Sequence, residues 1–307
     1  MRPTFAFGLS VALLLAAGVA QAQQAAQDQP AGALVPPTSA SDFTAGQLDA
    51  VLAGSWRSAH NKARDVYRHP KATLQFFGLQ PDKTVIEITP AGGWYAEILA
   101  PLLRDNGHYI AAVPAGNDAE ARQDAETLRA KFKADPDQYS KASIITYNPK
   151  APVFGPAGSA DMVLTFRNVH NWTMAGNAEA MFKAFYAVLK TGGTLGVVDH
   201  RAAPGATLDA VKDSGYLPTD YVIKLATDAG FKLDGQSEIN ANPKDTKNYP
   251  KGVWTLPPTL TLGDKDRDKY LAIGESDRMT LRFVKTGTNT APPAPAPTTT
   301  VGNQGAH

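Results

Sequence analysis

The chain has 307 residues and no cysteine, and its 30 basic (Lys, Arg) and 29 acidic (Asp, Glu) side chains give a formal net charge of +1. This composition excludes disulfides and lipid-modified cysteine, and it offers neither the basic stripe typical of nucleic-acid binding nor an acidic tail. A chain of this length can bury a core large enough to fold without covalent links.

The first residues have the pattern of a secretory signal. Arg2 precedes the mostly apolar run of residues 5–20, and Ala20-Gln21-Ala22 is a small-x-small pattern that signal peptidase accepts. We interpret residues 1–22 as a cleaved signal peptide, because the run is short for a membrane span. An uncleaved membrane anchor is the alternative. The expected protein is periplasmic or secreted, with no stable membrane insertion after cleavage.

Two stretches of low complexity flank a candidate domain. Residues 23–45 are interpreted as a flexible leader, and the Pro/Thr-rich residues 286–307 as an extended, solvated tail. Residues 46–285 between them have the length of one domain and show no internal repeat.

Helical and β-rich segments alternate along this domain. A helix is expected over residues 47–70, and further helices over 71–79, 94–104, 120–133, 178–190 and 220–229. Short β-rich runs are expected as strands over 84–88, 108–113, 143–147, 160–166, 194–199, 231–239 and 279–284. The alternation predicts an α/β fold with a doubly wound, mostly parallel seven-stranded sheet and an N-terminal helical cap. Its ligand is expected at the carboxyl ends of the strands.

The first strand leads into the turn EITPAGGWY, residues 87–95. Small residues in such a turn let backbone N–H groups and the N-terminus of the following helix approach a ligand closely. Because Gly-Gly before a helix is common, the prediction of a ligand site depends on the strand before it, the helix after it and the βα units downstream.

Five longer motifs carry a resemblance to a known family: ARDVYRHP (63–70), LTFRNVHNW (164–172), GVVDHRA (196–202), KNYPKGVWTLPPTL (247–260) and GESDRMTLRFVK (274–285). With the turn, they make residues 46–285 similar to class I S-adenosylmethionine-dependent methyltransferases, and more closely to an exported bacterial branch of predicted methyltransferases. The resemblance implies a Rossmann-like methyltransferase fold, S-adenosyl-L-methionine as cofactor and an unidentified, small-molecule methyl acceptor.

The resemblance also implies roles in the turn. Glu87 matches the acidic residue that orders the loop beside the methionine end of the cofactor, and Gly93 matches the last glycine of the motif. Thr89 and Ala91 replace the two earlier glycines. Alanine is tolerated there if its φ stays negative, whereas the stiff β-branch of threonine crowds the approach. The implied cofactor-binding residues are Glu87, Thr89, Pro90, Ala91, Gly92, Gly93, Trp94, Tyr95 and Asn168.

Polar residues follow the fourth and fifth strands, where catalysis is expected in this architecture. His170 is a candidate general base, since free imidazole has a pKa of about 6.5. Asn168 is a candidate ligand of the methionine amine or of a substrate, and Asp199 is expected to face His170. In the alternative interpretation, Arg167 and Asn168 only fix the next loop by hydrogen bonds, and Trp172 belongs to the core.

A metal site is another interpretation of this region, because His170, Asp199 and His200 combine two imidazoles with a carboxylate. No HExxH or other compact ligand spacing supports it, so we predict no metal. Pairing of Asp199 with Arg201 or Lys224 is the expectation instead.

Charged residues also gather at both ends of the domain. At helical spacing, Arg57, Asn61, Arg64 and Arg68 share a face that could cap the cleft and bind an anionic substrate. The alternative is a solvated face with Asp65 paired locally. A second group is interpreted as the ion-pair network of a hairpin: Glu275, Asp277 and Arg278.

Two further hypotheses compete with a methyltransferase. Export is at odds with a cofactor that is made in the cytoplasm, and Pro114 stands where many relatives place an acid for the ribose hydroxyls, with Asp118 the nearest acid. An exported non-catalytic binding protein with an eroded cofactor turn is therefore the alternative. A nicotinamide oxidoreductase is less well supported, because the Gly-x-Gly-x-x-Gly spacing is missing.

Overall fold

The computed structural model describes residues 45–116 and 119–287, all of which belong to the compact unit Pro36–His307. The predicted signal peptide, all but the last residue of the leader, and the tail beyond residue 287 lie outside the described residues. Among the described residues, no helix is both long enough and apolar enough to cross a membrane.

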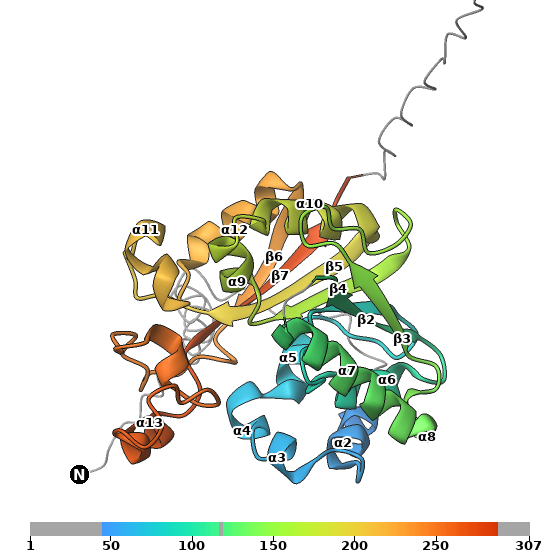
Figure 1. Cartoon of the computed structure of the whole chain (residues 1–307). Helices are drawn as coiled ribbons and strands as arrows, with labels where there is room; N and C mark the ends of the chain where they lie inside the picture. Colours follow the sequence, from blue (N-terminus) through green and yellow to red (C-terminus); the bar gives the residue numbers. More distant parts are fainter. Residues whose placement is uncertain (1–44, 117–118, 288–307) are drawn as a thin grey trace, which may run out of the picture. The chain divides into compact units, whose positions relative to one another are not determined.

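Seven strands form one sheet in the order β3-β2-β1-β4-β5-β7-β6 (Figure 1). They are β1 (Thr84–Ile88), β2 (His108–Pro114), β3 (Ser143–Tyr147), β4 (Ala160–Phe166), β5 (Leu189–His200), β6 (Phe231–Ser237) and β7 (Arg278–Lys285). All neighbouring strands are parallel except that β7 runs antiparallel to β5 and β6. The predicted doubly wound, mostly parallel sheet is confirmed.

Helices cover both faces of the sheet (Figure 1). On one face lie α9 (Val169–Met174), α10 (Ala178–Val188) and α12 (Thr219–Asp228); on the other lie α5 (Pro70–Phe76), α6 (Ala96–Leu103), α7 (Ala119–Ala134) and α8 (Pro136–Tyr139). Each face has its own apolar cluster, so the central strands are buried on both sides. This explains why β1 reads as a continuous run, Thr-Val-Ile-Glu-Ile, rather than as an alternating pattern.

The remaining elements are short. They are α11 (Leu208–Val211), the 3-10 turns η1 (Lys212–Ser214) and η2 (Gly252–Thr255), and α13 (Arg267–Ile273). The predicted helix over 178–190 ends at Val188, because the chain enters β5 at Leu189, five residues before the expected strand start. The first residues of β5 were not predicted as strand because they lack the apolar pattern of a buried strand: Lys190, Thr191 and Gly192 are polar or small, and they are exposed.

The expected single helix over residues 47–70 is wrong. It is divided into α2 (Ala45–Ala53), α3 (Ala59–Lys62) and α4 (Asp65–Arg68), and α5 follows at once. Gly54 ends the first piece, the Ser58 side chain accepts the backbone N–H of Asn61 at the start of the second, and His69 adopts a left-handed φ of 42° before Pro70. The short helices therefore change direction, and their charged side chains do not share one helical face.

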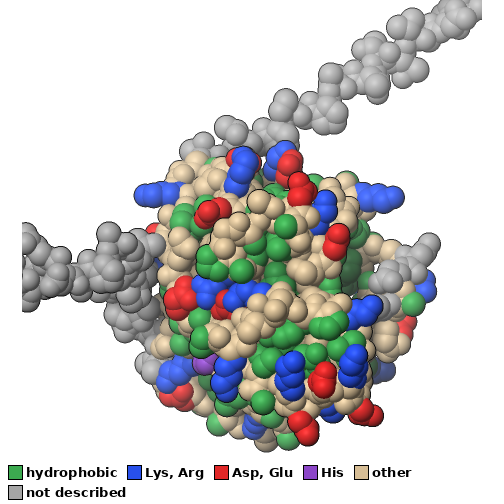
Figure 2. Space-filling view, turned by 90° about the vertical axis from the view of Figure 1, so that its left-hand side faces the viewer, with side chains coloured by type: hydrophobic (Ala, Val, Ile, Leu, Met, Phe, Trp, Pro, Cys, Tyr) green, Lys and Arg blue, Asp and Glu red, His purple; other side chains and the backbone are tan. Residues whose placement is uncertain are grey.

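Basic, acidic and apolar side chains are interspersed on the face that Figure 2 shows. This distribution agrees with the near balance of charges in the composition. That the protein binds no nucleic acid stays a prediction.

Candidate active site

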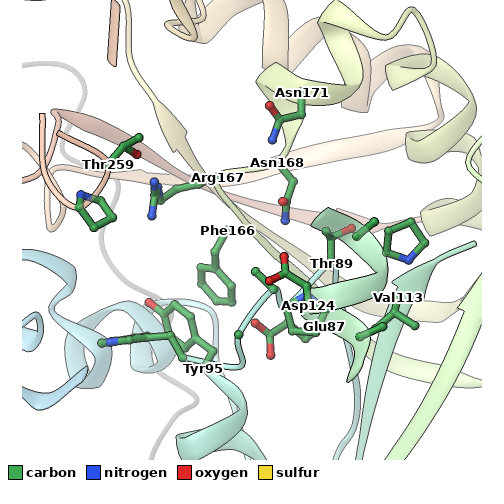
Figure 3. Close-up of a pocket in the computed structure, with 18 of the residues that line it drawn as sticks. Glu87, Thr89, Tyr95, Val113, Asp124, Phe166, Arg167, Asn168, Asn171 and Thr259 are labelled. Atoms are coloured by element: carbon green, nitrogen blue, oxygen red, sulfur yellow. The ribbon is translucent and has the colours of Figure 1, made fainter. Parts of the chain in front are cut away.

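A pocket of about 750 Å³ lies at the carboxyl ends of β1, β2 and β4, which is where the sheet topology predicts a ligand (Figure 3). Its volume is in the range of small-molecule sites. The three strand ends contribute Glu87 and Thr89, Val113 and Pro114, and Phe166 with the Arg167 and Asn168 that follow it.

The turn after β1 has the backbone shape of a glycine-rich loop without all of its glycines. Thr89, Ala91 and Gly93 have φ values of 50°, 49° and 79°, in the left-handed region. Ala91 therefore does not meet the condition of a negative φ under which alanine would be tolerated without strain. Thr89 is held by a 2.8 Å hydrogen bond between its hydroxyl and that of Tyr147. A left-handed conformation costs an L-residue roughly 1–2 kcal/mol, which the surrounding structure has to offset.

Close packing favours glycine at one position of this turn, Gly93. A Cβ on Gly93 would lie 2.7 Å from Leu128 Cδ1 of α7, whereas a Cβ on Gly92 would meet nothing within 4 Å. The last glycine thus lets the turn approach α7 closely, and Gly92 leaves open space beside the pocket that it lines.

Glu87 is the buried acid of the site. Its side chain is 3% exposed, and the Tyr109 hydroxyl donates to its Oε2 over 2.6 Å. Burial raises the pKa of Glu87 to about 7, although the Tyr109 hydrogen bond and the charges of Arg68 and Lys131 oppose this rise. A carboxyl group with such a pKa changes its charge readily when a cation binds beside it.

Asn168 connects β4 to β1. Its Nδ2 donates to the backbone oxygen of Ile88 over 2.9 Å and to Thr165 Oγ1 over 3.2 Å. This is the loop-fixing role considered from the sequence. The same side chain lines the pocket, and among the described residues its Oδ1 has no hydrogen-bond partner. Asn168 can therefore fix the strand ends and accept a hydrogen bond from a ligand.

His170 and Asp199 form a buried hydrogen-bonded pair. His170 Nδ1 lies 2.8 Å from Asp199 Oδ1, and the carboxylate also accepts the backbone N–H groups of His170 (3.3 Å) and His200 (2.7 Å). An acceptor at Nδ1 places the imidazole proton on that atom. The lone pair then resides on Nε2 of a residue that lines the pocket.

The expected pairing of Asp199 with Arg201 or Lys224 is wrong. Arg201 binds Glu238 and Asp277, and Lys224 binds Asp228 on its own helix. Asp199 is fully buried at the end of β5, where α9 packs, whereas Lys224 is largely solvent-exposed.

The neighbouring His200 extends the pair into a network. Its Nδ1 lies 2.5 Å from Ser276 Oγ, and its Nε2 accepts a 3.4 Å contact from Arg167 Nε. Burial, followed by the charges of His170 and Arg167, holds the pKa of His200 well below its usual value. Ligand atoms of His170, Asp199 and His200 lie within 4.8 Å of one another. A guanidinium at the His200 lone pair disfavours a cation there, and the metal-free site stays a prediction.

The charged residues from the two ends of the domain meet beside the pocket, where Arg64 and Arg68 line it. Arg64 and Arg68 both bind Glu275, and Arg278 binds the same carboxylate. Burial opposes ionisation of Glu275, but the charges of Arg68, Arg278, Arg167 and Arg64 outweigh it and lower its pKa to about 2. The predicted ion-pair network is present, but it joins segments more than 200 residues apart instead of closing a hairpin.

The solvated face considered for the N-terminal arginines is wrong, whereas the local pairing of Asp65 is confirmed. Arg57 and Arg68 are 3% and 7% exposed, and Arg57 makes two hydrogen bonds to Asp65. Asn61, Arg64 and Arg68 line the pocket. Arg57 is not among the residues that line it.

Several pocket residues were not identified from the sequence: Asp124, Asn171, Trp254, Pro258 and Thr259. Three of them lie in the motif KNYPKGVWTLPPTL, so that motif could have indicated them. Asp124 belongs to a polar helix in which nothing distinguishes it. Asp118, the acid considered for the ribose, lies outside the described residues, and Trp172 packs in the core as the structural interpretation expected.

No protein-family model matches the chain, and no curated protein matches it. Solved structures do. The [4+2]-cyclase SpnF matches with a TM-score of 0.50 at 14% identity, over 82% of this chain and 98% of its own. A putative sarcosine dimethylglycine methyltransferase from Galdieria sulphuraria matches with a TM-score of 0.50 at 10% identity, over 75% and 86%. A SAM-dependent methyltransferase from Aquifex aeolicus matches with a TM-score of 0.48 at 14% identity, over 64% and 94%.

The chain therefore has the fold of the class I S-adenosylmethionine-dependent methyltransferases, as the sequence resemblance implies. A cyclase and a methyltransferase are both among the similar structures, so the fold alone does not determine the reaction.

Proposed function

We propose that this protein is an S-adenosylmethionine-dependent methyltransferase with a small-molecule acceptor. The observation that carries the proposal is one pocket lined both by the left-handed turn after β1 and by the imidazole of the His170–Asp199 pair. The first feature suits a nucleotide-like cofactor, and the second suits removal of a proton from a nucleophile.

The chemistry of the lining fits this cofactor. The turn over residues 89–93 would hold it through backbone groups, the Glu87 carboxylate would accept its methionine ammonium, and Asn168 Oδ1 offers a further acceptor. When bound, S-adenosyl-L-methionine supplies an electrophilic methyl group on a positively charged sulfur.

The chain's own residues would position and deprotonate the acceptor. His170 Nε2 would take the proton of an acceptor hydroxyl or amine, while Asp199 fixes the imidazole and stabilises its charged form. The aromatic side chains of Tyr95, Phe166 and Trp254 would exclude water from the acceptor.

The alternative, a non-catalytic binding protein with an eroded turn, was suggested by Thr89, Ala91 and Pro114. The left-handed backbone at Thr89 and Ala91 supports a turn that keeps its shape. Asp124 lines the same pocket as Pro114, so the pocket has an acidic side chain although residue 114 is a proline. Both observations favour the methyltransferase.

Calorimetric titration of the chain with S-adenosylmethionine and S-adenosylhomocysteine tests the proposal. We expect micromolar binding that Glu87→Ala weakens. Absence of binding at millimolar ligand, with the circular dichroism of a folded protein, would rule out the methyltransferase and leave the binding protein.

We also propose that the protein is exported, on the signal pattern of residues 1–22. N-terminal sequencing of the protein from the periplasm or culture medium should give Gln23 as its first residue. A chain retained in the cytoplasm with its first 22 residues would contradict export.

A further inference from the structure

The guanidinium groups at one end of the pocket outnumber the carboxylates that form ion pairs with them among the described residues. Arg64, Arg68 and Arg167 line the pocket. Glu275 accepts from Arg64 Nε over 2.8 Å and from Arg68 Nε over 3.1 Å, and Arg278 Nη1 lies 3.2 Å from it as well. One negative charge thus serves three arginines before Arg167 is considered.

Arg167 has no counterion of its own. Within the described part of the chain, no carboxylate forms an ion pair with it, and its one hydrogen-bonding side-chain contact is with a neutral acceptor, His200 Nε2. Arg167 is partly buried, and desolvation, followed by the charge of Arg68, lowers its pKa to about 9, although the charge of Glu275 opposes this fall. A cation that loses hydration without gaining a counterion is destabilised, and an anionic ligand would offset that cost.

Arg64 supplies a second unused donor. Its Nε binds Glu275, while its Nη2 is buried and has no hydrogen-bond partner among the described residues. A buried N–H donor that lacks a partner costs about 1–3 kcal/mol. Guanidinium groups match the planar, bidentate geometry of carboxylates and phosphates.

The position of Arg167 separates it from the turn. Figure 3 shows Arg167 and Thr259 at one end of the pocket and Thr89 and Val113 at the other, with Phe166 and Asn168 between them. Arg167 itself has a left-handed φ of 64°, and its backbone N–H donates to the Val198 oxygen over 2.7 Å. Its backbone is therefore fixed at the end of the pocket away from the turn.

Glu87 does not serve as the missing counterion, because its oxygen Oε2 is bound by Tyr109 and its raised pKa leaves it partly protonated at neutral pH. Asp124 lines the pocket as well, but Figure 3 shows it on the side of Glu87 and Thr89, away from Arg167. The remaining anions that could meet the arginines are a group on the acceptor and the carboxylate of the cofactor.

We infer that the methyl acceptor is an anionic small molecule whose carboxylate or phosphate binds Arg167, assisted by Arg64. The inference rests on the proposed function, since it names the substrate class of the same site. The aromatic walls formed by Phe166 and Trp254 suit an acceptor that joins this anionic group to an apolar or aromatic body.

The test is a calorimetric titration of the full chain in two stages. S-adenosylhomocysteine is titrated first, and then benzoate or inorganic phosphate is titrated into the saturated protein. We expect at least one anion to bind the saturated protein. Because charge-assisted hydrogen bonds are strong, Arg167→Gln should weaken that anion at least 10-fold while changing the S-adenosylhomocysteine affinity less than about 2-fold.

Matched variants keep the result interpretable. Arg104→Gln, at an exposed arginine paired with Asp105, should leave both affinities unchanged. Arg64→Gln should weaken the anion in the same direction as Arg167→Gln, and it serves if Arg167→Gln does not fold.

Two outcomes would overturn the inference while the proposed function stands, and a third concerns the proposed function itself. Binding of neither anion to the saturated protein overturns it while the methyltransferase stands. A large loss of S-adenosylhomocysteine affinity in Arg167→Gln, with anion binding unchanged, assigns the arginine to the carboxylate of the cofactor. If S-adenosylhomocysteine itself does not bind, the proposed function fails; anion binding to the free chain that depends on Arg167 would then still support an anion site, and its absence would reject one.

Discussion

His170 Nδ1 lies 2.8 Å from Asp199 Oδ1, and both side chains are buried at the ends of neighbouring strands. Adjacent parallel strands bring their carboxyl ends together, so β4 and β5 place α9 and its histidine over the last acid of β5. The pairing places the proton on Nδ1 and leaves the lone pair on Nε2, which can then accept a proton.

Asp199→Ala should change the tautomer of His170. The substitution removes the carboxylate that accepts the Nδ1 proton, so the imidazole proton should move to Nε2, as the loss of the carboxylate does in catalytic triads. Nitrogen-15 NMR of the histidine side chains should show a protonated Nδ1 in the wild type and a protonated Nε2 in the variant. Ser276→Ala, which removes the partner of His200 Nδ1, should leave the His170 tautomer unchanged. An Nε2 proton on His170 already in the wild type would contradict the hydrogen bond from His170 Nδ1 to Asp199.

Ala91→Gly should stabilise the protein by about 0.5–1 kcal/mol. Relief of the left-handed strain at φ 49° favours glycine, and the greater freedom of glycine in the unfolded chain removes part of that gain. Urea denaturation measures the free energy of unfolding. If the turn binds the cofactor, the same substitution should also leave S-adenosylhomocysteine binding intact or improve it.

Gly93→Ala is the opposing variant. It should destabilise the protein by about 2 kcal/mol or more, because an added Cβ would be 2.7 Å from Leu128 Cδ1 at a φ of 79°. Equal changes in stability for Ala91→Gly and Gly93→Ala would show that the turn does not have this conformation.

Local sequence patterns predicted the sheet because each central strand is a short apolar run that stays buried wherever its neighbours lie. The strand order is implied only by the resemblance, and it makes β4 and β5 neighbours, which brings His170 to Asp199. The contacts of Arg64 and Arg68 with Glu275 cross more than 200 residues of sequence, and no local pattern contains them. Asp124 was missed for a related reason: which side of α7 faces the pocket depends on how that helix packs. The assigned roles of the pocket residues stay predictions.

Glu275→Gln should destabilise the protein by about 3–5 kcal/mol. The substitution removes the carboxylate that Arg64, Arg68 and Arg278 share and leaves buried cations without a counterion. Glu238→Gln is the matched control, because Glu238 pairs with Arg201 at a surface where its side chain is 73% exposed. Its loss should cost less than about 1 kcal/mol. Similar losses for the two variants, measured by urea denaturation, would contradict a dominant role for Glu275.

Glu87 should make the stability of the protein depend on pH. Its pKa is raised by burial from 4.5 to about 7 in the folded protein, so the folded chain holds a proton that the unfolded chain has already released. The free energy of unfolding should therefore fall as the pH rises from about 5 to about 8, by about 3 kcal/mol at roughly 1.4 kcal/mol per pKa unit. Other titrating groups contribute equally to wild type and variant, so the comparison is with Glu87→Gln, which should lack this part of the decline. Glu126→Gln, at an exposed position of α7, should instead follow the wild type at every pH. Parallel curves for the wild type and Glu87→Gln would show that the carboxyl group titrates normally, and that the pocket keeps it solvated rather than buried.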